Sequence, residues 1–215
     1  MQRSPRVVIV IPVYNDWEAA GRVIAGLGRA LAGAASATTI LLVDDGSSQG
    51  APSALAGVAE FAAVEVLALR RNLGHQRAIG VALAWIEKHR PCDAVVIMDG
   101  DGEDDPADVP RLLAGWEELG GHVIVFAERT RRSEGLVFRI SYMLFKMVHR
   151  LLTGLGVRVG NFSVMPYGRL RALTTVPDLW NHYAAAVFIS RLPFTAIPTV
   201  RAKRLAGRSS MNFPA

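Results

Sequence analysis

Five short runs of apolar, mostly β-branched residues punctuate the first 127 residues and constrain the fold more than any other feature. Uniformly apolar runs of this length are typical of strands that are buried on both faces of a sheet. The segments between them, residues 16–35, 52–62, 74–89 and 106–119, are each long enough for a helix. This alternation predicts an α/β fold, a Rossmann-like, mostly parallel sheet with helices on both faces. The five runs are RVVIVIPV, TTILLV, VEVLAL, DAVVIM and HVIVFA.

Composition narrows the class of protein further. The chain has 215 residues, of which 51% are hydrophobic and 20% charged, so we expect one globular domain and no extensive disorder. The single cysteine, Cys92, excludes an intrachain disulfide and a multi-cysteine metal site, and we predict that it is buried and inert. No run reaches 18 uncharged apolar residues, and the first apolar run is too short for a signal peptide, so neither a transmembrane helix nor a signal peptide is expected.

Charge divides the chain into two unequal parts. Residues 1–121 carry 10 Lys and Arg against 16 Asp and Glu, a net −6, and residues 122–215 carry 14 against 3, a net +11. The acidic part could hold a metal ion, and the basic part could hold phosphate or an anionic surface. Residues 135–152 are expected to form one long helix. It either packs in the core or lies in a membrane interface.

Polar and charged residues follow each predicted strand. Because right-handed crossovers place the carboxyl ends of parallel strands along one edge of the sheet, these residues should gather where ligands bind. Three of the five strand ends carry carboxylates, which makes this edge the expected functional site. The residues concerned are Tyr14 to Asp16, Asp44 to Ser47, Arg70 to Asn72, Asp99 to Asp105, and Glu128 with Arg129.

The stretch VVIMDGDGEDDP, residues 95–106, is the most unusual of these strand ends. Its five crowded carboxylates repel one another, so we expect a cation among them. An EF-hand is excluded, because its loop needs Gly at position six and Glu at position twelve, where this chain has Asp104 and Pro110. Neither G-x-G-x-x-G nor a Walker A sequence occurs in the chain, so a glycine-lined phosphate cradle is not expected.

With an EF-hand and a glycine-lined cradle excluded, the remaining hypothesis is a site that binds a diphosphate through a metal ion. Asp99 and Asp101, separated by the small Gly100, would supply hard oxygen ligands for Mg²⁺ or Mn²⁺. Asp104 and Asp105 are predicted to be N-terminal residues of a helix that begins near Pro106, where carboxylates favour the helix dipole.

Four motifs in this order and spacing resemble family 2 glycosyltransferases with the GT-A fold. They are IPVYND, LLVDDGSS, RNLGHQRAIGVAL and VVIMDGDGEDDP, and the resemblance spans about residues 6 to 212. The sequence looks most like the branch that moves a sugar from a nucleotide diphosphate-sugar to a polyprenyl phosphate, as dolichyl-phosphate mannose synthases do. The resemblance implies a single domain over residues 1–215. Residues 1–127 would bind the nucleotide sugar, and the basic residues 128–215 would form the acceptor side.

The resemblance also implies roles for individual residues. Asp99 and Asp101 would carry the metal, with Glu103 either as an additional ligand or as a group that contacts the ligands. Asp101, Arg129 and Arg208 would act in catalysis, the two arginines on phosphate oxygens. Ser210 stands where relatives often have lysine, which removes one cationic contact. The residues expected to bind the donor nucleotide are Pro12, Tyr14, Asp16, Asp44, Asp45 and Asp99.

Two residues are candidates for the acceptor side. Asn161 in GNFSVMP stands where polyprenyl-phosphate enzymes often have aspartate, and an amide cannot act as a general base. A phosphate acceptor needs no base, whereas a hydroxyl acceptor does. Asn161 therefore favours a phosphate acceptor. His182 is either a base for a hydroxyl acceptor or a surface or helix-packing histidine.

The expected function is a metal-dependent, inverting glycosyltransferase that uses Mg²⁺ or Mn²⁺. Its donor would be a UDP- or GDP-sugar and its acceptor a lipid phosphate, with the protein peripheral at the cytoplasmic face of the membrane and no nucleic-acid partner. Two alternatives stay open. One is a haloacid-dehalogenase-type phosphatase that forms an acyl-phosphate at Asp99, and the other is a catalytically silent GT-A module that only binds nucleotide sugar.

Overall fold

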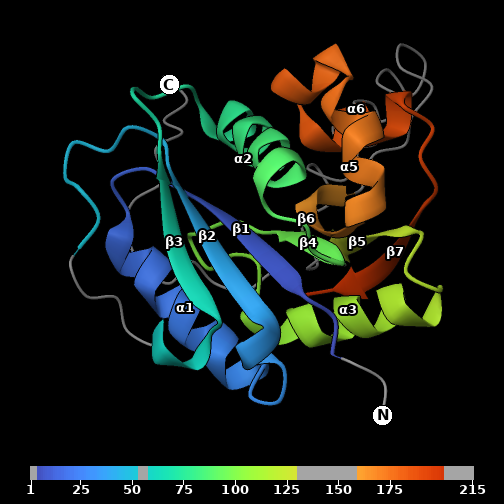
Figure 1. The fold of residues 1–215 in the computed structure, drawn as a ribbon, viewed down its shortest axis with the longest axis horizontal. Coiled ribbons are helices and arrows are strands. Elements are labelled where there is room, and N and C mark those ends of the chain that lie inside the picture. Colours follow the sequence, from blue (N-terminus) through green and yellow to red (C-terminus); the bar gives the residue numbers. More distant parts are fainter. Residues whose placement is uncertain (1–3, 53–57, 130–158, 201–215) are drawn as a thin grey trace, which may run out of the picture.

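The protein forms one seven-stranded sheet in a computed structural model that describes residues 4–52, 58–129 and 159–200. The strands lie side by side in the order β3-β2-β1-β4-β6-β5-β7 (Figure 1). Only β6 runs antiparallel to its neighbours, β4 and β5, so the sheet is mostly parallel. The strands are β1 Val7–Val13, β2 Thr38–Asp44, β3 Ala63–Ala68, β4 Ala94–Ile97, β5 Ile124–Arg129, β6 Val159–Pro166 and β7 Phe194–Thr199.

Helices cover both faces of this sheet. α1 and α3 lie on one face, and α2, α5 and α6 lie on the other (Figure 1). The α-helices are α1 Trp17–Ala30, α2 His75–His89, α3 Val109–Glu118, α5 Tyr167–Thr174 and α6 Tyr183–Ile189. Short 3₁₀ turns are η1 Ala35–Ala37, η2 Val58–Glu60, η3 Pro106–Asp108 and η4 Pro177–Trp180.

The apolar runs of β1, β2 and β4 are buried on both faces of the sheet, whereas the edge strand β3 is only partly buried. In β1, Val7, Ile9 and Ile11 pack in the core beneath α1 and α3, whereas Val8 and Val10 pack in the core beneath α2, α5 and α6. A strand whose alternate side chains enter two cores has to be apolar throughout, and a β-branched sequence suits the pleated backbone.

The five predicted strands and three of the four predicted helices are confirmed. In the segment 52–62, the described residues form only the 3₁₀ turn η2. β6, β7, α5 and α6 were not among the predicted elements. The predicted helix 135–152 lies outside the described residues. Within the described ranges, no helix is long and apolar enough to cross a membrane.

The topology places the expected ligand site at the carboxyl ends of the central strands. β1 pairs in parallel with β2 on one side and with β4 on the other, so the strand order reverses at β1. Ligands of open α/β sheets bind beyond the carboxyl ends of the strands at such a switch point. The residues that follow β1, β2 and β4 meet at this position.

Candidate active site

The loops that follow β1 and β2 are joined into one rim. The backbone N–H of Asn15 donates to Ser47 Oγ at 2.9 Å, and Asn15 Oδ1 accepts from the N–H of Ser48 at 2.8 Å. Asn15 has a φ of 54°, a left-handed conformation that asparagine tolerates better than most residues. The rim leaves the Tyr14 side chain 48% exposed at the carboxyl edge, where it can contact a ligand.

The two aspartates at the end of β2 hold backbone loops together. Asp45 is 3% exposed, and its two carboxylate oxygens accept from the N–H groups of Leu73, at 2.7 Å, and Gly74, at 3.0 Å. Asp44 Oδ1 accepts from the N–H of Ser47 at 2.8 Å. Asp45 thus fixes the loop that leads into α2, which sequence reasoning missed. A role of either residue in nucleotide binding stays a prediction.

The acidic stretch after β4 folds into a compact turn against β1. Asp101 Oδ1 accepts from the N–H of Glu103 at 2.9 Å. Gly100 is needed at this place, because a Cβ there would lie 2.9 Å from the carbonyl oxygen of Pro12. This contact brings the turn directly beside the end of β1, so Asp99 and Asp101 lie at the switch point.

The last two carboxylates of the stretch have different tasks. Asp105 caps η3, since its Oδ1 accepts from the N–H of Ala107 at 2.9 Å, which confirms its predicted place at a helix N-terminus. Asp104 differs from the prediction. It is 3% exposed, and its Oδ2 accepts from the N–H of Asp99 at 2.9 Å. Asp104 therefore closes the turn from inside, where a carboxylate can satisfy a buried backbone donor.

The carboxylates suit a hard divalent cation that also binds its substrate. In the described part of the chain, no three His, Cys, Asp or Glu side chains are grouped so that they could hold a metal ion by themselves, so Asp99, Asp101 and Glu103 do not form a preassembled set. Mg²⁺ needs no such set, because it is usually held by one or two carboxylates together with substrate phosphates and water. Asp99 and Asp101 fit that requirement.

His75 lies beside the acidic turn and was missed by sequence reasoning. It is the first residue of α2, its side chain is 43% exposed, and its Nε2 lies 3.1 Å from Asp99 Oδ1. Desolvation lowers the pKa of His75, but the hydrogen bond to Asp99 and the charges of Asp99, Asp101 and Asp104 outweigh it and raise the pKa above its ordinary value. Its place at the start of a helix at the same edge of the sheet was a partial signal, but its contact with Asp99 forms only in the folded chain.

Asn161 on β6 reaches the same place from the other half of the chain. Its Nδ2 lies 3.1 Å from His75 Nε2, and its Oδ1 accepts from Gln76 Nε2 at 3.2 Å. His75 Nε2 can donate to Asp99 when protonated or accept from Asn161 when unprotonated, so the two contacts compete. The predicted acceptor-side residue thus lies next to the predicted metal ligands.

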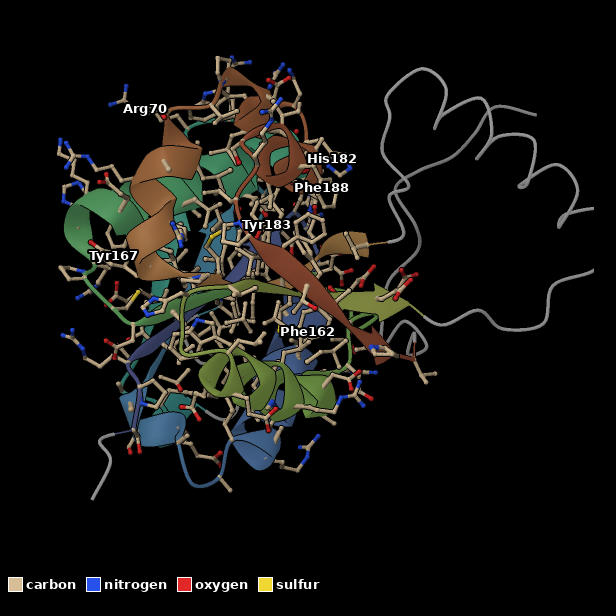
Figure 2. All side chains as sticks on the ribbon, turned by 90° about the vertical axis from the view of Figure 1, so that its right-hand side faces the viewer. Arg70, Phe162, Tyr167, His182, Tyr183 and Phe188 are labelled. Atoms are coloured by element: carbon tan, nitrogen blue, oxygen red, sulfur yellow. The ribbon has the colours of Figure 1, made fainter. Side chains whose placement is uncertain are left out.

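The structure does not bring His182 into this group. His182 lies on the outside of the molecule and caps α6, its Nδ1 accepting from the N–H of Ala185 at 3.4 Å, whereas the neighbouring Tyr183 is inside (Figure 2). Its position on the outside agrees with the alternative of a surface histidine, and its role as a helix cap was not predicted. Arg129 ends β5 at the carboxyl edge, but its side chain lies outside the described part of the structure, as does all of Arg208.

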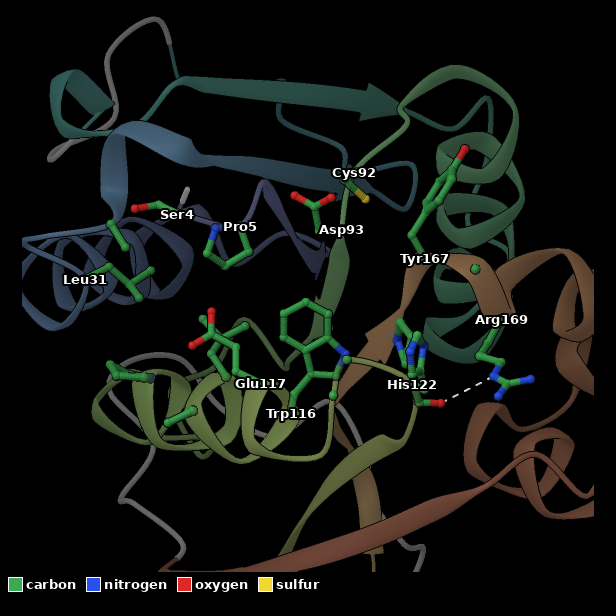
Figure 3. A pocket seen from close by; sticks show the side chains of 18 of the residues that line it. Ser4, Pro5, Leu31, Cys92, Asp93, Trp116, Glu117, His122, Tyr167 and Arg169 are labelled. Carbon is green, nitrogen blue, oxygen red and sulfur yellow. Dashed lines mark hydrogen bonds between the residues drawn. The ribbon is translucent and has the colours of Figure 1, made fainter. Parts of the chain in front are cut away.

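A cavity of about 1150 Å³ lies at the opposite edge, where the strands begin, and contains none of the predicted site residues (Figure 3). Three of its polar side chains are hydrogen-bonded within the chain, whereas the buried Trp116 Nε1 has no hydrogen-bond partner among the described residues. Asp93 accepts from the N–H of Arg6, the Tyr167 hydroxyl donates to the carbonyl of Glu87, and Arg169 Nε donates to the carbonyl of His122. Because none of the predicted site residues lines this cavity, the carboxyl edge is the better candidate.

Comparison with known proteins identifies the family. Residues 8–181 match the family described as "Glycosyl transferase family 2". The chain belongs to this family. This family 2 glycosyltransferase is 30% identical over 217 residues to the undecaprenyl-phosphate 4-deoxy-4-formamido-L-arabinose transferase of Klebsiella pneumoniae, and 27% identical over 221 residues to the enzyme of that name from Salmonella choleraesuis. Each alignment covers 97% of the chain, which spans 63% of the length of either relative.

Solved structures show the same GT-A fold. A mannosyltransferase from Pyrobaculum calidifontis in complex with GDP-Man and Mn²⁺ matches with a TM-score of 0.60 at 18% identity, covering 96% of this chain and 59% of that one. Glucosyl-3-phosphoglycerate synthase from Mycobacterium tuberculosis, in complex with Mn²⁺, UDP-glucose and glycerol 3-phosphate, matches with a TM-score of 0.65 at 18% identity, covering 94% and 73%. The predicted family, the predicted fold and the prediction of an enzyme are confirmed.

Proposed function

We propose that this family 2 glycosyltransferase is metal-dependent and inverting, and that it moves a sugar from a nucleotide diphosphate-sugar to a lipid phosphate. The observation that carries the proposal is the meeting of two groups at the switch point of the sheet. Asp99 and Asp101 offer carboxylates for a cation, and Asn161 offers an amide where a base would otherwise stand.

The donor would be held at the rim formed by the loops after β1 and β2. Tyr14, Asp16 and Asp44 are the proposed contacts of base and ribose, with Pro12 and Asp45 shaping the rim. A UDP- or GDP-sugar is the proposed donor class. Support comes from solved relatives of the same fold, which were crystallised with GDP-Man or UDP-glucose and with Mn²⁺.

Asp99 and Asp101 would hold Mg²⁺ or Mn²⁺ in contact with the donor diphosphate, with Glu103 as a nearby carboxylate. Such an ion, when bound, neutralises the negative charge that develops on a departing diphosphate. Arg129 and Arg208 are proposed to add charge-assisted hydrogen bonds to phosphate oxygens.

The transfer step follows from the acceptor chemistry. An acceptor oxygen attacks the anomeric carbon from the face opposite the diphosphate, the new carbon–oxygen bond forms, and the bond to the diphosphate breaks with its electron pair leaving on the diphosphate oxygen. A phosphate acceptor is already an anion at neutral pH, so no proton has to be removed. Asn161 is consistent with this chemistry, because an amide can orient an anionic oxygen but cannot deprotonate a hydroxyl.

The proposed acceptor is a polyprenyl phosphate at a membrane surface. The Klebsiella and Salmonella relatives carry undecaprenyl phosphate in their names, and the net +11 of residues 122–215 favours an anionic lipid surface. Within the chain, residues 1–127 would then serve the donor and residues 128–215 the acceptor.

One alternative function requires a test. A silent GT-A module would bind nucleotide sugar without turning it over. The family match sets aside the phosphatase alternative, since a haloacid dehalogenase belongs to a different family.

Two measurements separate transfer from silent binding. Thermal unfolding of the purified chain is measured with UDP- and GDP-sugars, each with and without Mn²⁺. We expect one nucleotide sugar to stabilise the protein in a metal-dependent way, by about 2.7 kcal/mol at a hundredfold excess over Kd. Transfer of radiolabelled sugar from that donor to polyprenyl phosphate then identifies an enzyme. Stabilisation without transfer to a phosphate or hydroxyl acceptor would identify a binding module instead.

A further inference from the structure

Two hydrogen-bond relays begin at Tyr183 and end at Asn161. In the first, the backbone N–H of Tyr183 donates to Gln76 Oε1 at 2.9 Å, and Gln76 Nε2 donates to Asn161 Oδ1 at 3.2 Å. In the second, the Tyr183 hydroxyl lies 2.8 Å from Ser163 Oγ, which donates to the carbonyl oxygen of Asn161 at 2.9 Å. Asn161 is therefore held through its side chain and through its backbone.

The first relay has only one consistent polarity. A backbone N–H can only donate, so the Gln76 atom that faces Tyr183 has to be the carbonyl oxygen Oε1. The amide nitrogen of Gln76 then faces Asn161, and the Asn161 atom opposite it has to be an acceptor. Asn161 Oδ1 is therefore turned to Gln76, and its NH₂ group is turned to His75 and the acidic turn, as the 3.1 Å distance to His75 Nε2 shows.

The second relay also has one polarity, and it holds the backbone carbonyl of Asn161. Ser163 uses its hydroxyl hydrogen on the Asn161 carbonyl, so the Tyr183 hydroxyl has to donate to Ser163 Oγ. Tyr183 is fully buried, and burial raises the pKa of its hydroxyl, so the hydrogen is retained. Figure 2 shows Tyr183 on the inner side of α6, from where it supports β6.

We propose that Gln76 is a positioning residue, which turns the amide of Asn161 so that its NH₂ group donates to an anionic oxygen of the acceptor. One hydrogen of this NH₂ group is directed at His75 Nε2, and the second has no partner in the described ranges 4–52, 58–129 and 159–200. A hydrogen bond from an amide to a charged oxygen is stronger than one to a neutral hydroxyl, so this polarity selects a phosphate acceptor. The inference rests on the proposed transfer to a lipid phosphate.

Gln76→Glu tests the polarity at nearly constant shape. One carboxylate oxygen of the new side chain still accepts from the N–H of Tyr183, but the other can no longer donate. Asn161 then has to turn its NH₂ group towards residue 76 and present Oδ1 to the acceptor, which repels an anionic oxygen. We expect the KM for a polyprenyl phosphate to rise about 10- to 100-fold. The KM for the nucleotide sugar should stay within about twofold.

Two further variants separate positioning from simple structural support. Gln76→Met has a similar length but no polar atom, so Asn161 loses its support without being turned, and the acceptor KM should rise less than in Gln76→Glu. Glu87→Gln is the reverse exchange on the same helix, about three turns away, and should leave both KM values unchanged. A merely structural role would instead give both Gln76 variants a similar loss of kcat and thermal stability.

The outcomes are distinguishable. If the wild-type chain transfers sugar to a polyprenyl phosphate but Gln76→Glu keeps the wild-type acceptor KM, the role of Gln76 is refuted and the proposed function stands. A parallel rise in donor and acceptor KM also refutes it. If the wild-type chain transfers no sugar to a lipid phosphate, the proposed function and this inference fall together. Should Gln76→Glu not fold, Gln76→Met must itself raise the acceptor KM selectively, and an unchanged KM overturns the proposal.

Discussion

Asp101 and Asp105 lie in the same crowded acidic stretch, but the roles proposed for them differ. Asp105 is occupied as the cap of η3, whereas Asp101 is a proposed holder of the cation beside the switch point. This difference allows the function of a carboxylate to be separated from its effect on local charge.

Asp101→Ala is expected to lower the rate of sugar transfer by at least about 10²- to 10³-fold, the typical cost of removing one electrostatic contact to developing charge. The measurement is transfer of labelled sugar at saturating Mn²⁺, together with the thermal unfolding midpoint. Asp105→Ala is the control, and it should cost about 1 kcal/mol of stability through loss of a cap while keeping the wild-type transfer rate. Equal transfer rates for wild type and Asp101→Ala would refute the metal assignment.

Cys92 is predicted to be chemically inert in the folded protein. Burial, together with the charge of Asp93 and against the smaller effect of Arg6, raises the pKa of its thiol from 9.0 to about 12. At pH 9 about half of the thiols in the unfolded chain are thiolates, against about one in a thousand in the folded protein. Alkylation by iodoacetamide should therefore be about 1000-fold slower in native protein than in guanidinium chloride. A difference below tenfold would contradict the burial of this thiol.

At the scale of elements, the strand-end loops are held together by contacts that leave little room for substitution. Gly46, after β2, has a φ of +73°, and a Cβ there would lie 2.5 Å from backbone atoms of Arg71 and Asn72. The loop after β2 therefore packs backbone to backbone against the loop after β3, next to the Asp45 bonds to Leu73 and Gly74.

Gly46→Ala should destabilise the protein by about 2–4 kcal/mol, since it adds both left-handed strain and steric overlap. Gly33→Ala is the matched control, because a Cβ at residue 33 meets nothing within 4 Å, and its effect should stay within about 0.5 kcal/mol. Urea unfolding followed by circular dichroism measures both changes. Similar free energies of unfolding for the two variants would show that the loops move apart more easily than this packing suggests.

Strands can be predicted from the sequence where a run of apolar residues marks them locally. β1, β2 and β4 are apolar strands buried on both faces, and β3 and β5 are apolar over most of their length, so the positions of these strands could be inferred from the sequence pattern alone. β6 was not predicted, because it starts with the polar residues of GNFSVMP, whose pairing with β4 and β5 is set by tertiary contacts. For the same reason His75 and Gln76 were missed. Their roles depend on Asp99 and Asn161, which are distant in sequence and meet only in the folded chain.

At the scale of the whole molecule, the sheet joins two regions of opposite charge. The net −6 of residues 1–121 includes the carboxylates of the proposed cation site, and the net +11 of residues 122–215 is proposed to bind an anionic acceptor or surface. β6 belongs to the second region but pairs with β4 from the first, which is how Asn161 comes to lie beside the acidic turn.

This distribution predicts salt-dependent binding to anionic membranes. In liposome flotation, the protein should bind vesicles that contain anionic lipid and should not bind neutral phosphatidylcholine vesicles. Binding should weaken as salt is added, because exposed charges are screened beyond a Debye length of about 10 Å at 0.1 M ionic strength. Neutralising Lys203 and Arg204 to Gln should weaken binding more than neutralising Arg29 and Lys88, although both pairs change the net charge equally. Equal loss in the two double variants would mean that net charge alone governs binding, and absence of flotation on anionic vesicles would rule out a peripheral membrane role for this chain.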